Sequence, residues 1–250
     1  MDSSSASVEC TGRHLATGDV LRRSLILLLL LGAAACGPRR NAEQPLLHDR
    51  VDVSPQSADA GGLVVERSEF ACLDHPLIDA WEDRLRTQRA FRVTTIDSLV
   101  RGNQYLGRFR EILREAGLPP ALALLPVVES SFRVNARGPG GSVGLWQLQA
   151  PTARRFGLIV NRRHDERLDP ERATQAAVAY LAMLHDRYED WPLALAAYNA
   201  GEGRVDRALK KLPDSDYWSL IAAHRLSPIT RDYVPRFFAT VRMVESSPAC

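Results

Sequence analysis

Three short segments carry residues whose types and spacing could do chemistry. In the first, the apolar run Leu122-Ala-Leu-Leu-Pro-Val-Val ends at Glu129. Partial desolvation at the end of an apolar helix raises the pKa of a carboxyl group, and a raised pKa suits a general acid near neutral pH. The alternative is an ordinary glutamate at a helix end, facing solvent or paired with an arginine. This segment alone leaves both interpretations open.

The second segment is rich in glycine and reads Gly140-Gly-Ser-Val-Gly-Leu-Trp146-Gln147. Glycines permit tight turns and a close approach of a ligand to the backbone. Trp146 offers a flat apolar face, and Gln147 offers a donor and an acceptor, a pair that suits sugar rings with N-acetyl groups. Taken alone, the segment is better interpreted as a loop followed by a core tryptophan.

The third segment is Ala196-Ala-Tyr198-Asn199-Ala-Gly201. Its small residues allow close packing of helices, and Asn199 and Gly201 suit a turn between two helices. The hydroxyl of Tyr198 could reach a carboxylate. The alternative is a buried tyrosine whose hydroxyl is satisfied elsewhere.

Together, the order and spacing of these segments resemble the catalytic domain of lytic transglycosylases, above all the membrane-bound murein transglycosylases of the D type. Gln147 follows Glu129 by 18 positions, and Tyr198 follows Gln147 by 51 positions. The resemblance covers about residues 75 to 245. Further matching segments are Thr152-Ala-Arg-Arg-Phe-Gly-Leu158, Asp165-Glu-Arg-Leu-Asp-Pro170, Leu193-Ala-Leu-Ala-Ala-Tyr-Asn-Ala-Gly-Glu-Gly-Arg-Val205 and Thr230-Arg-Asp-Tyr-Val-Pro235.

The resemblance implies a mostly α, lysozyme-like fold related to goose-type lysozyme. It also implies cleavage of the β-1,4 bond between N-acetylmuramic acid and N-acetylglucosamine in peptidoglycan. Glu129 matches the catalytic glutamate, which would protonate the glycosidic oxygen and then accept the proton of the muramoyl C6 hydroxyl, leaving a 1,6-anhydro product. Tyr198 matches the tyrosine that holds the glutamate, and Gln147 and Asn199 match positions that contact the glycan. This scheme departs from the usual pair of carboxylates because the nucleophile belongs to the substrate.

Two positions depart from the pattern of the resembled family. Gly138 stands where many relatives carry serine, and Gln149 stands where many carry methionine. Both departures concern contacts with the substrate and leave the core reaction unaffected. Ser130, which follows the matched glutamate, is expected to support the end of its helix.

Two other functions remain open. A goose-type hydrolytic muramidase would use water and a second carboxylate, for which Asp165 and Asp169 are candidates, although Asp169 is also interpreted as a helix cap. A non-catalytic peptidoglycan-binding scaffold is the third possibility, and the presence of Glu129 and Tyr198 argues against it. The chemical form of the product ends distinguishes the two enzymes.

The elements that must position these residues are predicted to be helices. From about residue 74 onward, apolar residues recur at helical spacing, and Gly117 is expected to end one helix before two prolines. Asp169-Pro-Glu171 is expected to begin another, since it combines a cap, a proline at the first helical position and an acid. No β-branched alternation is sustained over six positions. The apolar face of that second helix comprises Ala173, Ala177, Tyr180, Leu181, Leu184 and Tyr188.

The first 36 residues have the features of a secretory signal. Two arginines precede the apolar run Leu25–Leu31, which is too short to span a bilayer, and small residues then lead to Cys36. This pattern resembles the lipobox of bacterial lipoproteins, with lipidation at Cys36, although Ala33 stands where the lipobox prefers leucine. The alternative is an ordinary secretory signal. The polar residues before the arginines indicate a mis-assigned start, with translation beginning near Val20.

The chain is therefore expected to have three parts. Residues 1–35 are the signal peptide, residues 36–69 are a lipid-anchored flexible linker of Pro, Ser, Gly and charged residues, and residues 70–250 are the catalytic domain. The predicted location is the periplasm of a Gram-negative bacterium, with the anchor in the outer membrane. Cys72 and Cys250 would remain after processing and could form a disulfide in that oxidising compartment.

Composition excludes several classes of protein. Of 250 residues, 45% are apolar and 25% are charged, which excludes a fully disordered chain, a collagen-like repeat and a polytopic membrane protein. The formal net charge of +2 provides no electrostatic footprint for nucleic acid. Without CxxC, HExxH or clustered histidines, no metal or other cofactor is expected. The expected partners are peptidoglycan glycan strands and, through the anchor, a membrane; the protein is expected to be a monomer.

Overall fold

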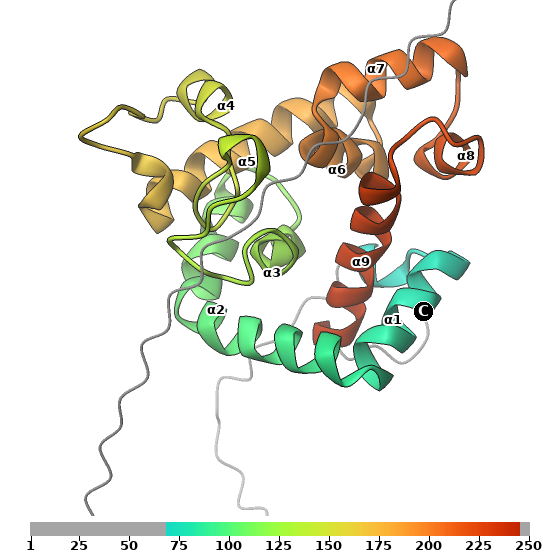
Figure 1. The fold of residues 1–250 in the computed structure, drawn as a ribbon, viewed down its shortest axis with the longest axis horizontal. Helices are drawn as coiled ribbons and strands as arrows, with labels where there is room; N and C mark the ends of the chain where they lie inside the picture. The colour runs from blue at the N-terminus through green and yellow to red at the C-terminus, as the bar shows by residue number, and fades with distance from the viewer. Residues whose placement is uncertain (1–68, 246–250) are drawn as a thin grey trace, which may run out of the picture. The chain divides into compact units, whose positions relative to one another are not determined.

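The computed structural model describes residues 69–245, and helices dominate this part of the chain (Figure 1). The predicted signal peptide, residues 36–68 of the predicted linker and Cys250 lie outside the described residues. No helix between residues 69 and 245 is long and apolar enough to cross a membrane. The α-helices are α1 (Pro76–Thr87), α2 (Arg89–Glu115), α3 (Leu125–Glu129), α4 (Ala150–Arg155), α5 (Pro170–Tyr188), α6 (Trp191–Ala200), α7 (Glu202–Lys211), α8 (Tyr217–Ala222) and α9 (Pro228–Glu245). The 3₁₀ turns are η1 (Glu69–Cys72), η2 (Pro120–Leu124), η3 (Pro139–Gly141) and η4 (Glu166–Leu168).

The predicted mostly α fold class is confirmed. Over the described range, β-structure is limited to isolated bridges, two of which meet at Val143 and one of which joins Val160 to Asp165. The two bridges at Val143 pair it with Arg137 and Leu148 and so close the glycine-rich segment into a compact loop.

The two helix ends that were predicted from local signals are also confirmed. Asp169 caps α5, because its carboxylate accepts the N–H of Glu171 at 3.0 Å and that of Arg172 at 2.9 Å, and Pro170 is the first residue of the helix. Beyond α2, Gly117 has a left-handed φ of 70°. That conformation lets the following N–H, of Leu118, bond back to the carbonyl of Leu113 at 2.9 Å.

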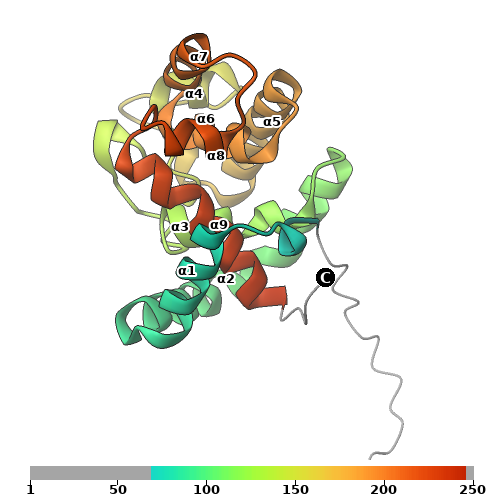
Figure 2. The same ribbon diagram turned by 90° about the vertical axis from the view of Figure 1, so that its right-hand side faces the viewer.

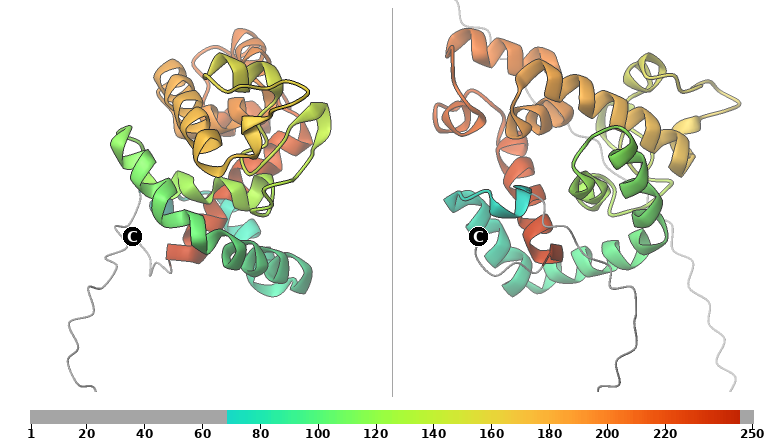
Figure 3. Two further views of the ribbon diagram at one scale, coloured as in Figure 1. Left: turned by 90° about the vertical axis from the view of Figure 1, so that its left-hand side faces the viewer. Right: turned by 180° about the vertical axis from the view of Figure 1, so that it is seen from behind.

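Helix α9 connects the parts of the domain. Its C-terminal part packs against α1, and its N-terminal part packs against α6, as two perpendicular views show (Figures 1 and 2). Helix α5 packs against α6, and α2 packs against η2 and α1 (Figure 3). Helix α3 contacts both α2 and α9. The short helix that ends at Glu129 is therefore held between the longest helix and the last described one.

The core beneath α3 is rich in aromatic residues. Phe109, Phe132 and Trp146 are almost completely buried, and neighbouring rings in this group lie 5.6 to 6.4 Å apart between centroids. Phe132 follows Glu129 by three positions. The core thus holds the chain immediately after the predicted catalytic residue.

Candidate active site

Glu129 is the last residue of α3, in which Leu125, Pro126 and Val127 are buried and Val128 is partly buried. The helix ends there because the N–H groups of Ser130 and Phe132 both donate to the carbonyl of Pro126, at 3.1 and 3.0 Å. The Ser130 hydroxyl also donates to the carbonyl of Leu145 at 2.8 Å. Ser130 therefore fastens the end of α3 to the glycine-rich loop, as expected from the sequence.

The turn after Glu129 has an unusual backbone. Ser131 and Phe132 both have left-handed φ values, 52° and 53°, which cost non-glycine residues about 1 kcal/mol or more each. The ring of Phe132 offsets this cost by packing in the core over Gly102 of α2. A Cβ at position 102 would lie only 2.6 Å from Phe132 Cε2, so glycine is required there for the ring to fit.

The carboxyl group of Glu129 is desolvated and has a strong hydrogen-bond partner. The hydroxyl of Tyr233, on α9, donates to Glu129 Oε1 at 2.6 Å. Burial raises the pKa of Glu129 to about 7, while the Tyr233 hydrogen bond and the positive charge of Arg236 act in the opposite direction. The residue as a whole keeps some exposure. The group can thus hold a proton near neutral pH and still be reached from solvent.

The structure corrects the role expected for Tyr198. Its hydroxyl donates to the main-chain carbonyl of Trp146 at 2.7 Å, and the hydroxyl bonded to Glu129 belongs to Tyr233. Burial raises the pKa of Tyr198, and the charge of Glu129 is close enough to raise it further. The sequence signal for Tyr233 is the segment Thr230-Arg-Asp-Tyr-Val-Pro235, which also matches the resembled family and contains this tyrosine.

Gln147 braces the loop in which it lies. Its φ is 49°, its Oε1 accepts the Ser142 hydroxyl at 2.8 Å, and its Nε2 donates to the carbonyl of Gly144 at 2.8 Å. The same Nε2 lies 3.3 Å from the carbonyl of Ala136. Both ends of the amide are thus engaged within the loop, and the contact between Gln147 and a glycan remains a prediction.

Gly138 is explained by the same network. A Cβ at this position would lie 2.3 Å from Gln147 Oε1 and 2.5 Å from Ser142 Oγ. Those two atoms are hydrogen-bonded to each other, so they fill the space that a side chain at position 138 would need. Many relatives carry serine where this chain has Gly138, and here the hydroxyl of Ser142 occupies the space beside that position.

Asn199 joins α6 to α9. Its Oδ1 accepts the hydroxyl of Thr230 at 3.1 Å, and the residue is partly exposed near the end of α6. Thr230 and Tyr233 are three positions apart and so lie on adjacent turns of α9. The structure therefore connects Asn199 to the helix that supplies the hydroxyl on Glu129, and its contact with a glycan remains a prediction.

Trp146 is a core residue. It is fully buried, and its indole N–H donates to the hydroxyl of Thr174 at 2.8 Å. The interpretation of Trp146 as a stacking surface for a sugar is wrong, because its ring has no accessible face. The plainer interpretation, a loop followed by a core tryptophan, is correct.

The two alternative carboxylates have other partners. Asp165 makes two hydrogen bonds to the buried guanidinium of Arg167, at 2.9 and 2.8 Å, and that interaction lowers the pKa of Asp165. Asp169 caps α5. Among residues 69–245, no group of three or more His, Cys, Asp or Glu side chains could hold a metal ion.

Comparisons with known proteins agree with this geometry. Residues 109–221 match the family described as the transglycosylase SLT domain. The membrane-bound lytic murein transglycosylase D of Escherichia coli (strain K12) is 34% identical over 156 residues, which are 60% of this chain and 34% of that protein. The membrane-bound lytic murein transglycosylase F of Shewanella loihica (strain ATCC BAA-1088 / PV-4) is 36% identical over 97 residues, which are 36% of this chain and 19% of that protein.

One solved structure is similar over part of its length. It is an inactive mutant of the lytic transglycosylase Slt from Pseudomonas aeruginosa, with a TM-score of 0.47 and 24% identity over 66% of this chain and 25% of that one. The chain spans about a third of the transglycosylase D sequence and about a fifth of the transglycosylase F sequence. The SLT match includes Glu129, Gln147, Tyr198 and Asn199. Residues 109–221 of this chain therefore match the transglycosylase SLT domain family, and the described residues have the mostly α fold class expected from the sequence.

Proposed function

We propose that this protein is a peptidoglycan lytic transglycosylase that cleaves the β-1,4 bond between N-acetylmuramic acid and N-acetylglucosamine without water. The observation that carries the proposal is the environment of Glu129, a carboxyl with a pKa of about 7 that accepts a 2.6 Å hydrogen bond from Tyr233. The SLT match and the similarity to lytic murein transglycosylases support the substrate class.

In the first step, protonated Glu129 acts as the general acid. It donates its proton to the glycosidic oxygen, and the bond between that oxygen and C1 of the muramic acid breaks. A pKa near the working pH favours this step, since the acid is then both sufficiently populated and sufficiently strong. Positive charge develops at C1 as the leaving group departs, while Glu129 becomes a carboxylate.

In the second step, the same carboxylate acts as the base. It accepts the proton of the C6 hydroxyl as the C6 oxygen bonds to C1, which closes the 1,6-anhydro ring and restores protonated Glu129. Tyr233 stabilises the carboxylate form between the two steps through its hydrogen bond, and Arg236 does so through its charge. No water is consumed, and no second carboxylate is needed.

The hydrolytic alternative receives less support. An inverting or retaining hydrolase needs a second carboxylate beside the sugar ring, at a separation set by its mechanism. Asp165 is bound to Arg167 and Asp169 to the first turn of α5, so each has a structural role. The scaffold alternative does not account for the desolvated carboxyl of Glu129.

Digestion of purified sacculi tests the proposal directly. The wild-type protein should release muropeptides with 1,6-anhydro ends in mass spectra, and Glu129→Gln should lower their rate of release by at least about a thousandfold, because the amide cannot transfer the proton. Reducing ends in place of anhydro ends would establish hydrolysis. Undiminished release by Glu129→Gln would move the chemistry to another residue.

We also propose that the mature protein is a periplasmic monomer anchored to the outer membrane by lipid on Cys36. The support is the signal-like pattern of residues 1–36 together with the membrane-bound relatives. In cells fed labelled palmitate, the wild-type protein should carry label and fractionate with the outer membrane, whereas Cys36→Ser should lose the label and become soluble. Label that persists in Cys36→Ser would contradict the assignment.

A further inference from the structure

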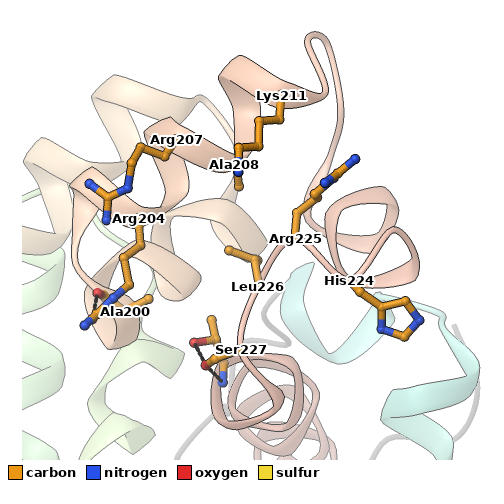
Figure 4. A pocket seen from close by; sticks show the side chains of 10 residues that line it. Ala200, Arg204, Arg207, Ala208, Lys211, His224, Arg225, Leu226 and Ser227 are labelled. Atoms are coloured by element: carbon orange, nitrogen blue, oxygen red, sulfur yellow. Dashed lines mark hydrogen bonds between the residues drawn. The ribbon is translucent and has the colours of Figure 1, made fainter. Parts of the chain in front are cut away.

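A basic hollow lies between α7 and the segment that joins α8 to α9 (Figure 4). Its volume is about 300 Å³, at the lower end of the range for small-molecule sites and enough for one or two amino-acid residues. Ala208 and Leu226 lie between its two walls, and Ser227 lies at its base in the view of Figure 4. The lining residues are Ala200, Arg204, Arg207, Ala208, Lys211, His224, Arg225, Leu226, Ser227 and Thr230.

The hollow carries uncompensated positive charge. Four arginine or lysine side chains line it, and none of its described lining residues is Asp or Glu. The two acidic residues of α7 are engaged elsewhere, since Glu202 pairs with Arg155 at 2.7 Å and Asp206 pairs with Arg187 at 2.8 Å. Arg204, Arg207 and Lys211 belong to α7, whereas Arg225 belongs to the opposite wall (Figure 4), so positive charge surrounds the hollow and would attract an anionic ligand.

The residues of the hollow adjoin residues of the candidate active site. Thr230 lines it and donates its hydroxyl to Asn199, and Ala200, the next residue after Asn199, lines it as well. Tyr233 lies one turn further along α9 and holds Glu129. The hollow and Glu129 are therefore linked through two short stretches of chain, residues 199–200 and 230–233.

We infer that this hollow binds the carboxylates of the peptide stems that branch from the glycan strand. The inference rests on the proposed function, because the glycan would place a stem near Asn199. Each N-acetylmuramic acid of peptidoglycan carries a short acidic peptide, and guanidinium groups bind carboxylates through paired hydrogen bonds. The glycan would contact the site around Glu129 while a stem carboxylate enters the basic hollow.

Enzyme kinetics on two forms of one substrate test this inference. Glycan strands with intact stems are compared with the same strands stripped of their stems by an amidase. The pocket variant combines Arg207→Gln, Lys211→Gln and Arg225→Gln, and it spares Arg204 because that side chain donates to the carbonyl of Ala200 at 2.6 Å. The matched control removes the same number of exposed positive charges through Arg89→Gln, Arg162→Gln and Arg163→Gln.

The pocket variant should raise KM about tenfold on intact strands, the loss expected for one charge-assisted contact, without changing kcat. On stripped strands it should behave as the wild type does, and the control should match the wild type on both. An unchanged KM on intact strands, or an equal rise on stripped strands, would overturn the inference. Pocket-dependent sedimentation with phosphatidylglycerol vesicles, at unchanged KM, would assign the hollow to phosphate headgroups instead.

A binding measurement separates this inference from the proposed function. Calorimetric titration of Glu129→Gln with a soluble stem peptide should show binding that the three pocket substitutions abolish. Absence of such binding would refute the stem-peptide site even if anhydro products form. Absence of anhydro products from the wild type, with peptide binding intact, would instead refute the transglycosylase proposal.

Discussion

At the scale of single residues, the main feature of the site is the balance between the protonated and ionised forms of the Glu129 carboxyl. Burial favours the protonated form of Glu129, whereas Tyr233 and Arg236 favour the ionised form, and the resulting pKa is about 7. A group so balanced can donate a proton and accept one at the same pH. Removing either stabilising partner should therefore shift the pH dependence of activity in a known direction.

Replacing Tyr233 with phenylalanine tests the first partner. Loss of the hydrogen bond destabilises the carboxylate, so the pKa of Glu129 should rise above its wild-type value of about 7. The decline of kcat/KM on the alkaline side should therefore begin at a higher pH than in the wild type. Loss of positioning should also lower kcat by about 10- to 100-fold. A pH–rate profile measured on defined glycan strands provides both values.

Tyr198→Phe serves as the matched control. It removes a hydroxyl of the same kind, but one that donates to the carbonyl of Trp146. The alkaline limb of the pH–rate profile should therefore lie at the same pH as in the wild type. If Tyr198→Phe shifted the limb and Tyr233→Phe did not, the hydrogen bond that controls Glu129 during catalysis would involve Tyr198.

The raised pKa of Glu129 also makes the domain less stable at high pH. Its value is about 7 when folded, against the usual 4.5 of an unfolded chain, so between these values the folded state keeps a proton that the unfolded state releases. Stability therefore falls as pH rises through this window. Above pH 7 the penalty is up to about 3 kcal/mol, whereas below pH 4.5 it vanishes.

Glu129→Gln should remove that penalty. In urea denaturation at pH 8.5 the variant should be more stable than the wild type by up to about 3 kcal/mol, and at pH 4 the two should be close. Glu189→Gln, at an exposed position, is the control and should follow the wild type at both values. Equal stability of Glu129→Gln and the wild type at pH 8.5 would show that the carboxyl is solvated.

At the scale of elements, the sequence predicted what depends on local signals. The cap at Asp169 and the end of α2 near Gly117 were found because a few neighbouring residues determine each. The assignment of Tyr198 to Glu129 failed for the opposite reason. Two motifs each supply a tyrosine, and the packing of α9 beside α3 determines which of them bonds to Glu129. That packing brings together Glu129 and Tyr233, which are 104 positions apart.

Gly102 illustrates a constraint between elements that no local pattern reveals. In an exposed helix interior, Gly→Ala usually stabilises by about 0.5–1 kcal/mol, and Gly107→Ala should do so because nothing lies within 4 Å of its new Cβ. Gly102→Ala should instead destabilise the domain by about 1–3 kcal/mol, because its Cβ would meet the ring of Phe132 at 2.6 Å. Thermal unfolding of the two variants should shift in opposite directions.

The Gly102→Ala substitution should also affect the geometry of the candidate active site. Phe132 holds the turn that directly follows Glu129, so a displaced ring moves the end of α3 and should lower kcat, whereas Gly107→Ala should leave kcat unchanged. A stabilised Gly102→Ala would mean that Phe132 can move aside without cost. That outcome would remove the packing argument for the left-handed turn.

At the scale of the whole described domain, α9 connects the regions on which the proposed activity depends. Thr230 and Tyr233 connect it to Asn199 and Glu129, and Arg242, further along, pairs with Asp79 of α1 at 2.7 Å. The basic hollow, the carboxyl of Glu129 and α1 thus all contact α9. A substitution that shifts α9 should therefore affect substrate binding and the pKa of Glu129 together.

The 104-position gap between Glu129 and Tyr233 also has a consequence for biosynthesis. During synthesis, Glu129 emerges well before α9, so an incomplete chain contains this acid but lacks the Tyr233 hydroxyl and the positive charge of Arg236 that stabilise its carboxylate. The carboxyl gains its partners only when the last described helix docks. Completion of folding therefore controls when Glu129 acquires the environment that sets its pKa, because the chain before α9 lacks both Tyr233 and Arg236.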